Sequence, residues 1–583
     1  MEANMKKEEI IRGELPNPAF ARANWRSLNG DWDFAFDPED KLQKQGIENV
    51  VFDKTICVPF CYESELSGIN TDMPSKSVWY RRTLTVTEAE LSGSVLLHFG
   101  AVDHVAKIWL NGQFVGCHEG GFTPFVFEVS SLLRAGENTL IVKAEDSYAQ
   151  ELPRGKQMWA REPRSCFYRN TTGIWQSVWL EFTGCDYITD IRITPDLDRN
   201  RADFEIRTLS GKAADLRLTI SLNQQALGSM VVNCGDRRTQ CSFGFLENGV
   251  NSIFDLYWTP EFPNLLAVKV ELVRDGQVLD TVDTYFGMRK VHICGEQMYL
   301  NNSPMYQRLV LDQGYWPDGL MTAPTDEAIR KDVELTKAMG FNGARKHQKI
   351  EDPRYYYWAD KLGLLVWGEM PSNYDFTTEG QRMFLSEMQA FMKRDYNHPC
   401  IITWIPFNES WGVHQIVGDP MQKAFVKAGY YLLKSLDNTR LVGSNDGWEQ
   451  LNLTDFCGIH DYGITPDNFA SRYKDIEETM RGSVNFKPVY ASGETYNNSP
   501  ILITEMGGVK LKDDGGWGYN QDMVDSESMV TYLRGMMKAM RDHERVRGFC
   551  YTQLTDVQQE TNGLLDGNRE PKVALEVLKT IFG

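Results

Sequence analysis

Two glutamates stand directly after apolar stretches of strand length. Residues 401–407 (IITWIPF) are followed by Asn408 and Glu409, and residues 501–504 (ILIT) are followed by Glu505. A carboxylate next to a buried run is costly unless it is paired or used. Hydrolysis of a glycosidic bond uses two carboxylates, an acid/base and an opposing group. One glutamate alone could be a structural partner of an arginine such as Arg345, whereas the pair predicts glycosidase chemistry.

Other polar side chains share this position at the end of an apolar run. Glu369 follows residues 364–367, Asp312 follows residues 306–311, and His460 and Tyr462 end the run that begins at residue 456. Parallel strands of one barrel end on the same face, so we expect these side chains to lie near the two glutamates. His460 has no partner at metal-binding spacing, and we expect no metal site.

The elements that must position these residues alternate between strand and helix from about residue 291. Thr325 precedes an amphipathic segment that stops at Gly340, and Asp352-Pro353 opens another that stops at Gly363. Eight strand–helix repeats predict a TIM barrel over residues 291–583. The expected strands are residues 306–311, 341–345, 364–367, 401–407, 440–443, 456–460, 501–504 and 548–552.

An open doubly wound sheet is the alternative to this barrel. In such a sheet the first strand is typically followed by a glycine-rich loop that binds phosphate. The residues after the first expected strand read Asp312-Gln-Gly-Tyr and contain no such loop. The pattern therefore favours the barrel.

The first half of the chain has the pattern of two all-β domains. In residues 1–183 short alternating runs are separated by turn signals, such as Asn111-Gly112 after residues 107–110, and they predict a jelly-roll sandwich. Residues 184–290 repeat the pattern in a smaller unit, which predicts an immunoglobulin-like sandwich. We therefore expect a multidomain protein of jelly roll, immunoglobulin-like sandwich and (β/α)8 barrel.

Composition excludes several other classes of function. The 583 residues are 42% hydrophobic and carry a net charge of −19, which argues against nucleic acid and anionic membranes as partners. The 11 cysteines show no zinc-binding or disulfide spacing, and we expect reduced thiols and no cofactor. The first residues contain no apolar segment, so a cytoplasmic protein is expected unless a leader was removed.

The motifs resemble glycoside hydrolase family 2, the family of β-galactosidases and β-glucuronidases, over almost the whole chain. Residues 24–32 (NWRSLNGDW) and 172–179 (TGIWQSVW) resemble the opening and closing strands of the family's jelly roll. Residues 397–409 (NHPCIITWIPFNE) are similar to its long and specific acid/base signature, and residues 341–345 through 365–367 resemble its second signature less closely. The resemblance implies a sugar-binding sandwich, an immunoglobulin-like domain and a catalytic barrel.

The resemblance also implies a role for each matching residue. Glu409 matches the general acid/base, and Glu505 matches the nucleophile that forms a glycosyl-enzyme intermediate. Asn408 would bind the sugar 2-hydroxyl. Tyr462 would donate a hydrogen bond to the nucleophile, and Arg345 would help to keep it ionised.

Aromatic residues near these motifs are expected to shape the site. Trp404, Phe407 and Trp411 could raise the pKa of the general acid by excluding water. Tyr551 occupies the position of a family tryptophan that lines the sugar pocket, with core filling as the alternative. Trp517 lies in a glycine-rich loop where it could stack on a sugar or pack on the surface.

The residues after the second strand depart from the family pattern and raise the question of an anionic sugar. Lys349 and Arg354 lie where β-galactosidases have His-Tyr-Pro after small residues, and Phe167 is aligned near an aspartate of the galactosidase sandwich. Arginine and lysine pair with carboxylates such as that of a hexuronic acid. The glucuronidase motif Asn-x-Lys is missing after the eighth strand. The alternative is that these bases are a solvated helix start paired with Glu351 and Asp352.

The hypothesis is a retaining exo-β-glycosidase that removes a terminal galactose-type or hexuronic acid residue, with a β-glycoside or β-uronide as substrate. A β-glucuronidase with a non-standard carboxylate site is the first alternative. A non-catalytic carbohydrate-binding protein and an interaction scaffold, which would present a large exposed apolar patch, are alternatives of other classes. A homo-oligomer is compatible with the sequence, which does not identify it.

Overall fold

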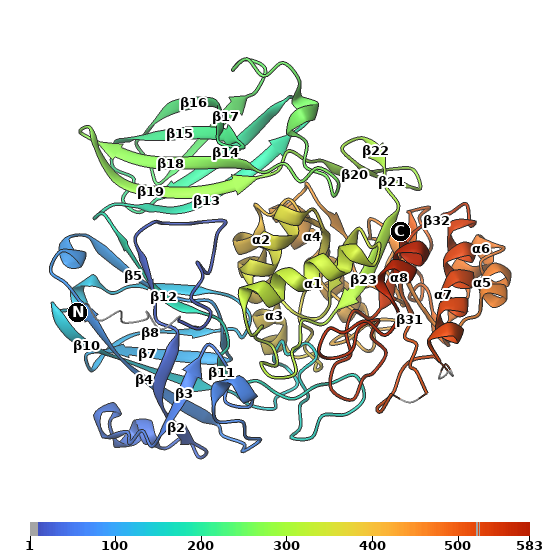
Figure 1. Cartoon of the computed structure of the whole chain (residues 1–583), viewed down its shortest axis with the longest axis horizontal. Helices are drawn as coiled ribbons and strands as arrows, with labels where there is room; N and C mark the ends of the chain where they lie inside the picture. Colours follow the sequence, from blue (N-terminus) through green and yellow to red (C-terminus); the bar gives the residue numbers. More distant parts are fainter. Residues whose placement is uncertain (1–9, 513, 521–522, 524) are drawn as a thin grey trace, which may run out of the picture.

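The computed structural model describes residues 10–512, 514–520, 523 and 525–583. Three folded units follow one another along the chain, and each has its own apolar core. In Figure 1 the blue and green sandwiches lie beside and above the yellow-to-red barrel. No helix in the described part of the chain has the length and apolar character needed to cross a membrane.

The first unit is a sandwich of two antiparallel sheets, as the alternating pattern predicts. Its hairpin at Asn111-Gly112 has φ values of 51° and 81°, the left-handed geometry of a tight two-residue turn. One sheet has the order β1 (Trp25–Ser27), β12 (Val178–Thr183), β5 (Ser94–Phe99) and β9 (Phe125–Glu128). The other has the order β3 (Lys54–Val58), β2 (Gly30–Asp37), β4 (Ser77–Val86), β10 (Gly136–Glu145), β7 (Val105–Leu110) and β8 (Gln113–Glu119), and β6 (Val102–Asp103) pairs with β11 (Gly173–Ile174).

The second unit is a smaller antiparallel sandwich. Leu216, Leu218 and Ile220 alternate along one strand and point into its core, which is the period of two expected for a half-buried strand. Its sheets are β13 (Ile188–Asp196), β14 (Arg201–Thr208) and β17 (Arg238–Gly244), and β16 (Gln225–Cys234), β15 (Ala214–Leu222), β18 (Leu266–Arg274) and β19 (Gln277–Phe286).

The third unit contains the eight expected parallel strands, with ends within three residues of the predicted positions. Their hydrogen-bonded order is β27 (Leu441–Val442), β26 (Ile401–Ile405), β25 (Leu365–Glu369), β24 (Gly343–Lys346), β23 (Gln307–Asp312), β32 (Val546–Thr552), β31 (Ile501–Gly507) and β28 (Cys457–Tyr462). Every residue of β26 is buried, because the strand has the barrel interior on one side and helices on the other. This explains its continuous apolar sequence.

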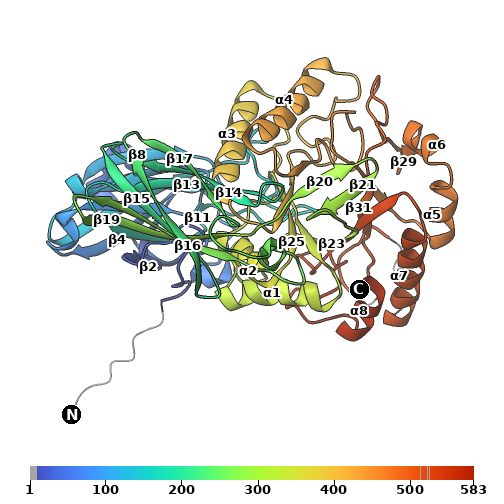
Figure 2. The same cartoon turned by 90° about the horizontal axis from the view of Figure 1, so that it is seen from above.

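Helices cover the outside of the barrel, as Figure 2 shows for α1 to α4 and α7. The predicted caps are present: the Thr325 side chain accepts from Ala328 N, the Asp352 side chain accepts from Arg354 N, and Gly363 has a φ of 74°. The helices are α1 (Asp326–Ala338), α2 (Pro353–Leu362), α3 (Thr378–Asp395), α4 (Pro420–Leu436), α5 (Pro466–Arg472), α6 (Ile476–Arg481), α7 (Ser526–Arg541) and α8 (Leu575–Phe582). Short strands β20 (Val291–Cys294), β21 (Gln297–Leu300) and β22 (Ser303–Pro304) precede the barrel, and β29 (Ser483–Val484) pairs with β30 (Lys487–Pro488).

A long segment of the first sandwich, residues 146–172, lies across the carboxyl ends of the barrel strands; we call it the mouth segment. The backbone N–H groups of Arg154 and Gly155 donate to Ser372 O at 2.9 and 3.0 Å, beyond β25. Gln559, beyond β32, donates to Ser165 O at 2.6 Å. In Figure 1 this blue-green chain runs from the sandwich beneath the barrel. The face of the barrel expected to carry chemistry is therefore partly built by another domain.

The two sandwiches are joined by a buried arginine. Arg22 is 4% exposed and contacts Asp280 of β19 at 3.0 Å and Glu181 of β12 at 2.5 Å. Replacing Arg22 by Met would leave two buried carboxylates without their main partner, and we expect the free energy of unfolding to fall by about 3–5 kcal/mol.

The control is Arg26→Met, which removes a half-exposed ion pair with Glu90 and should cost less than about 1 kcal/mol. Denaturant unfolding of both variants measures the difference. Equal losses in the two variants would contradict a special role for the buried arginine.

Candidate active site

The centre of the site is the guanidinium of Arg345, at the end of β24, which is fully buried. Its Nε lies 2.7 Å from Glu369 Oε2, and its Nη1 lies 2.8 Å from Asp446 Oδ2 and 3.0 Å from Glu505 Oε1. Its Nη2 donates to Asn408 Oδ1 at 2.6 Å. Burial alone would lower the pKa of Arg345, but the surrounding carboxylates raise it well above the usual value. Arg345 thus joins the ends of β24, β25, β26 and β31 to the loop after β27.

The two predicted glutamates are brought together at this end of the barrel. One oxygen of Glu409, one oxygen of Glu505 and a ring nitrogen of His460 all lie within 4.8 Å of one another. The side chain of Glu505 is 5% exposed and that of Glu409 is 15% exposed. The two carboxylates are therefore close, largely shielded from solvent, and reachable from one side.

The turn that carries Glu409 has an unusual backbone. Glu409 and Ser410 have φ values of 52° and 60°, a region that non-glycine residues rarely adopt and that costs conformational energy. The loop after β27 holds this turn in place: Asp446 O accepts from Glu409 N at 2.8 Å, and Asn445 Oδ1 accepts from Ser410 N at 3.0 Å. The position of the glutamate is thus fixed by its neighbours.

Glu505 is held on both oxygens. Arg345 binds Oε1, and the Tyr462 hydroxyl donates to Oε2 at 2.5 Å. Burial and the charge of Glu505 raise the pKa of Tyr462 well above its usual value, so the phenol stays protonated. The Tyr462 hydroxyl also lies 2.8 Å from Thr552 Oγ1, and its ring stacks on Tyr519 with ring centroids 4.2 Å apart.

His460 lies between the two glutamates. Its Nδ1 is 2.7 Å from Glu409 Oε1 and 3.5 Å from Glu505 Oε2, and its Nε2 is 3.3 Å from Asp446 Oδ2. Burial alone would lower the pKa of His460, but Glu505, Asp446 and Glu409 together raise it to about 10. The imidazole is therefore charged at neutral pH and compensates part of the negative charge of the site.

The side-chain amide of Asn408 has its oxygen bonded and its NH2 group free. Its Oδ1 accepts the hydrogen bond from Arg345, whereas its Nδ2 is buried and has no hydrogen-bond partner among the described residues. A buried donor without a partner is costly. The arrangement therefore leaves Asn408 Nδ2 available for a hydroxyl group of a bound molecule.

The basic residues after β24 are occupied by protein partners. Lys346 Nζ lies 2.9 Å from Asp312 and 2.7 Å from Glu351, and Lys349 Nζ lies 2.9 Å from Glu351. Lys349 Nζ also donates to Gly314 O and Met321 O at 2.7 and 2.8 Å. Burial lowers the pKa of Lys349, although Glu351 opposes this. Arg354 pairs with Asp326 at 2.6 Å.

The alternative reading of these bases, a solvated helix start paired with Glu351 and Asp352, is correct only about the pairing with Glu351. Glu351 is indeed the partner of the lysines, but these side chains are buried, with Lys349 only 1% exposed, and do not form a solvated helix start. Asp312, a predicted substrate-binding residue, is the partner of Lys346. None of these groups has a free ammonium or guanidinium directed at the two glutamates.

The aromatic residues fall into two groups. Trp404 donates its Nε1–H to Asp437 and packs on Phe391 of α3, and Phe407 packs on Phe384 with ring centroids 4.9 Å apart. These two rings therefore face the helix layer, and the expectation that they surround the general acid is wrong. For Trp404 the reason is the two-residue period of β26, which turns alternate side chains away from the barrel interior, whereas Phe407 lies beyond the end of the strand, where this period no longer applies.

Trp411, in contrast, lies at the mouth of the barrel. Its ring centroid is 5.5 Å from that of Phe167, which belongs to the mouth segment, and 5.6 Å from that of Tyr374, whose hydroxyl donates to Gly155 O of the same segment. Trp517 Nε1 donates to Ser165 O of the mouth segment at 3.0 Å, and its ring lies 4.9 Å from Tyr519.

Tyr551 is fully buried and packs on Phe582 of α8, with ring centroids 5.7 Å apart. The next residue, Thr552, is the one that reaches Tyr462. Tyr551 therefore fills the core, which is the alternative to lining the sugar pocket.

Several residues of the site were not found from the sequence. Asp446 follows the short strand β27 and carried the same strand-end signal as the glutamates, so it could have been found. Glu560 accepts a hydrogen bond from Tyr168 of the mouth segment at 2.6 Å, and Lys156 lies nearby. These last contacts join two domains and have no signal in the local sequence.

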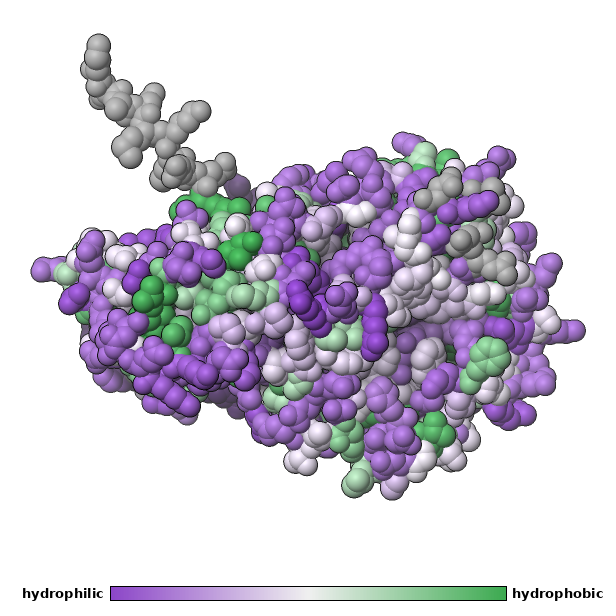
Figure 3. Space-filling model, turned by 90° about the horizontal axis from the view of Figure 1, so that it is seen from below, coloured by the Kyte–Doolittle hydropathy of each residue, from purple (hydrophilic) through white to green (hydrophobic). Residues whose placement is uncertain are grey.

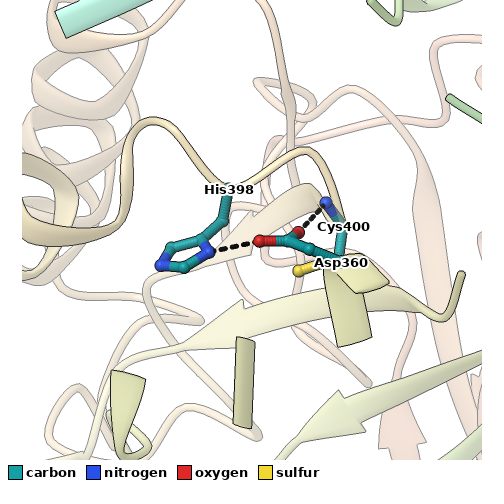
Figure 4. Close-up of side chains that lie close together, drawn as sticks. All are labelled: Asp360, His398 and Cys400. Atoms are coloured by element: carbon teal, nitrogen blue, oxygen red, sulfur yellow. Dashed lines mark hydrogen bonds and ion pairs between the residues drawn. The ribbon is translucent and has the colours of Figure 1, made fainter. Parts of the chain in front are cut away.

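A second group of side chains has metal-like spacing but lies at the opposite end of the barrel. Figure 4 shows Asp360, His398 and Cys400, the last two just before β26 begins. The Asp360 carboxylate accepts from Cys400 N at 2.8 Å and from the Tyr285 hydroxyl at 2.9 Å, and it lies 2.5 Å from His398 Nδ1. Because Tyr285 belongs to β19, this network is accounted for as a contact between the second sandwich and the barrel.

The family is identified by comparison of the chain with protein-family models. Residues 25–180 match the sugar-binding domain of glycosyl hydrolases family 2, residues 186–289 match its central domain model, and residues 291–583 match its TIM barrel domain. A β-galactosidase of Thermoanaerobacter pseudethanolicus is 28% identical over 377 residues, 63% of this chain and 48% of the relative. One of Alteromonas mediterranea is 25% identical over 485 residues, 75% and 44% of the two chains. The chain spans about half the length of these relatives.

Solved structures share the whole fold. A β-galacturonidase from Eisenbergiella tayi bound to galacturonate superposes with a TM-score of 0.73 at 21% identity, covering 98% of this chain and 99% of the other. A β-glucuronidase from Ruminococcus gnavus in complex with D-glucuronic acid has a TM-score of 0.80 at 19% identity, covering 98% and 100%. With the matched family models, this establishes that the chain belongs to glycosyl hydrolase family 2.

Proposed function

We propose that this protein is a retaining exo-β-glycosidase that hydrolyses a terminal, non-reducing galactose-type or hexuronic acid residue. The observation that carries the proposal is the pair Glu409 and Glu505, with oxygens within 4.8 Å of each other at the covered mouth of the barrel. Retaining glycosidases place the two carboxyl groups about 5–5.5 Å apart, whereas inverting enzymes leave about 6.5–9.5 Å for a water molecule. The short separation supports the retaining mechanism.

The surroundings of the two glutamates support different roles. Glu505 is oriented by Arg345 and Tyr462, and its carboxylate attacks the anomeric carbon as the bond to the leaving oxygen breaks. Glu409 gives its proton to that oxygen. In the second step Glu409 takes a proton from water, the water oxygen bonds to the anomeric carbon, and Glu505 is released. The free Nδ2 of Asn408 would bind the 2-hydroxyl.

The mouth segment supports action on a chain end. It is tied to the loops beyond β25 and β32, and its aromatic residues Trp159 and Phe167 pack against Tyr374. A polysaccharide running through the site would need both sides of the barrel end to be open. A covered side favours entry of one terminal sugar.

The two other classes of function have less support. A non-catalytic carbohydrate-binding protein does not need a charged histidine and an arginine that hold two carboxylates this close. An interaction scaffold would present a large continuous apolar surface. In Figure 3 the face seen from below is largely hydrophilic, with separate small apolar areas.

Glu505→Gln tests the nucleophile. We expect turnover of nitrophenyl β-galactoside, β-galacturonide and β-glucuronide to be abolished, because a neutral amide cannot form the glycosyl-enzyme ester. A 2-fluoro glycoside with an activated leaving group should label the wild-type protein on Glu505, as read by peptide mass spectrometry. Glu477→Gln on the half-exposed face of α6 is the control and should keep full activity. Turnover by Glu505→Gln would refute the assignment.

Glu409→Ala tests the acid/base. We expect kcat with an unactivated leaving group to fall by about 10²–10⁴-fold, and less with a dinitrophenyl group, which leaves without protonation. Azide should restore the second step and yield a β-glycosyl azide. An equal loss for both leaving groups, with no azide product, would contradict general acid catalysis by Glu409.

The raised pKa of His460 should make the free energy of unfolding depend on pH. Its pKa is about 10 in the folded protein and about 6.5 in an unfolded chain, so the folded state binds more protons between these values. The stabilisation is complete below about pH 6.5 and is lost as the pH rises toward 10. His460→Asn should therefore flatten the decline of the unfolding midpoint between pH 7 and 10. The exposed His414→Asn is the control, and an unchanged slope in His460→Asn would contradict a charged His460.

A further inference from the structure

One buried cation near the two glutamates forms no direct ion pair with a described residue. Lys156, in the mouth segment, is 3% exposed, and its Nζ makes no hydrogen bond or ion pair with any described residue. It lies over the face of Trp411, 5.1 Å from the ring centroid, and 6.0 Å from the rings of Phe167 and Tyr168. By comparison, the equally buried Lys143, Lys346 and Lys349 each contact at least one carboxylate.

The surroundings of Lys156 keep it charged and place it at the site. Burial alone would lower its pKa, yet Cys166, Glu560, Glu505 and Glu409 raise it. Its ring partner Trp411 belongs to the turn that carries Glu409. Lys156 therefore lies within the electrostatic field of both candidate catalytic groups without forming a direct pair with either.

The nearest anion along the mouth segment is already occupied. Glu560 accepts from the Tyr168 hydroxyl at 2.6 Å and from Asn562 Nδ2 at 3.4 Å, and burial raises its pKa. The charge of Lys156 opposes this rise in pKa, so Glu560 acts on Lys156 through space, without a hydrogen bond or an ion pair between them. A buried ammonium whose N–H groups have no acceptor is costly. The donors of Lys156 Nζ are therefore available for an acceptor on a bound molecule.

We infer that Lys156 binds the carboxylate of a β-linked hexuronic acid and makes this protein a β-uronidase rather than a β-galactosidase. The inference rests on the proposed glycosidase function. The cation comes from the first sandwich and not from the barrel. Lys349 and Arg354, the bases expected from the barrel sequence, are already paired with Glu351 and Asp326. A carboxylate matches the ammonium both in charge and in hydrogen bonding, whereas a neutral sugar hydroxyl matches it only in hydrogen bonding.

Lys156→Met tests the inference, because methionine keeps an apolar stem against Trp411 and removes the charge. We expect kcat/KM for nitrophenyl β-galacturonide or β-glucuronide, whichever the wild type prefers, to fall about 10- to 150-fold, the usual effect of losing a charged hydrogen bond. Activity on nitrophenyl β-galactoside should stay the same or rise. Lys156→Arg should recover part of the uronide activity. Arg161→Met, which removes an exposed charge from the same segment, is the matched control and should change neither activity.

A binding measurement separates this inference from the catalytic assignment. In the Glu505→Gln background, titration calorimetry with galacturonate, glucuronate and galactose should show weaker binding of a uronate after Lys156→Met and no change for galactose. If the wild type hydrolyses galactosides and neither hydrolyses nor binds uronides, the glycosidase function stands and the inference falls. Parallel losses on charged and neutral substrates would also overturn it, because Lys156 would then act only on the glutamates. Lys156→Gln serves as a second variant if Lys156→Met does not fold, as judged by circular dichroism.

Discussion

The buried guanidinium of Arg345 is the interaction on which the rest of the site depends. A cation inside a barrel is tolerated only when its charge and its donors are matched, and three carboxylates and one amide oxygen match them here. Because these partners come from different strand ends, the charge balance also fixes the relative positions of the strands. Removing one of the carboxylates would change the charge balance in a dry environment, and removing the amide would leave a buried donor without an acceptor. The geometry of the site and the stability of the barrel end are therefore linked.

The same principle explains how two glutamates can stand so close. Two like charges at this distance would repel each other strongly in a buried site. Arg345 on one side and the protonated His460 between them provide opposite charge, and His460 also contacts Asp446. Glu409 receives no arginine and stays on the more exposed side, while Glu505 is enclosed. The asymmetry between the two carboxylates therefore arises from the neighbours that each strand end provides.

Much of the barrel and its central residues could be predicted from the sequence, because both follow local patterns. The apolar run of residues 501–504 ends in Glu505, and a parallel strand of that kind must end at the catalytic face. Errors arose where the two-residue period mattered: Tyr551 and Thr552 are neighbours, but only Thr552 faces the site. Lys349 has an acidic residue two positions later that takes up its charge. Lys156 could not be identified at all, since it lies in an irregular segment whose place is set only by the contact between two domains.

The mouth segment has a consequence for how the candidate site is assembled. Its residues belong to the first sandwich in sequence, yet their contacts with Ser372, Tyr374 and Glu560 belong to the barrel that is synthesised last. An isolated barrel would keep Arg345 and both glutamates but would lack Lys156 and the ring of Phe167. The site proposed here is therefore complete only when two independently cored units dock, and the proposed activity would depend on assembly of the chain as much as on the folding of the barrel.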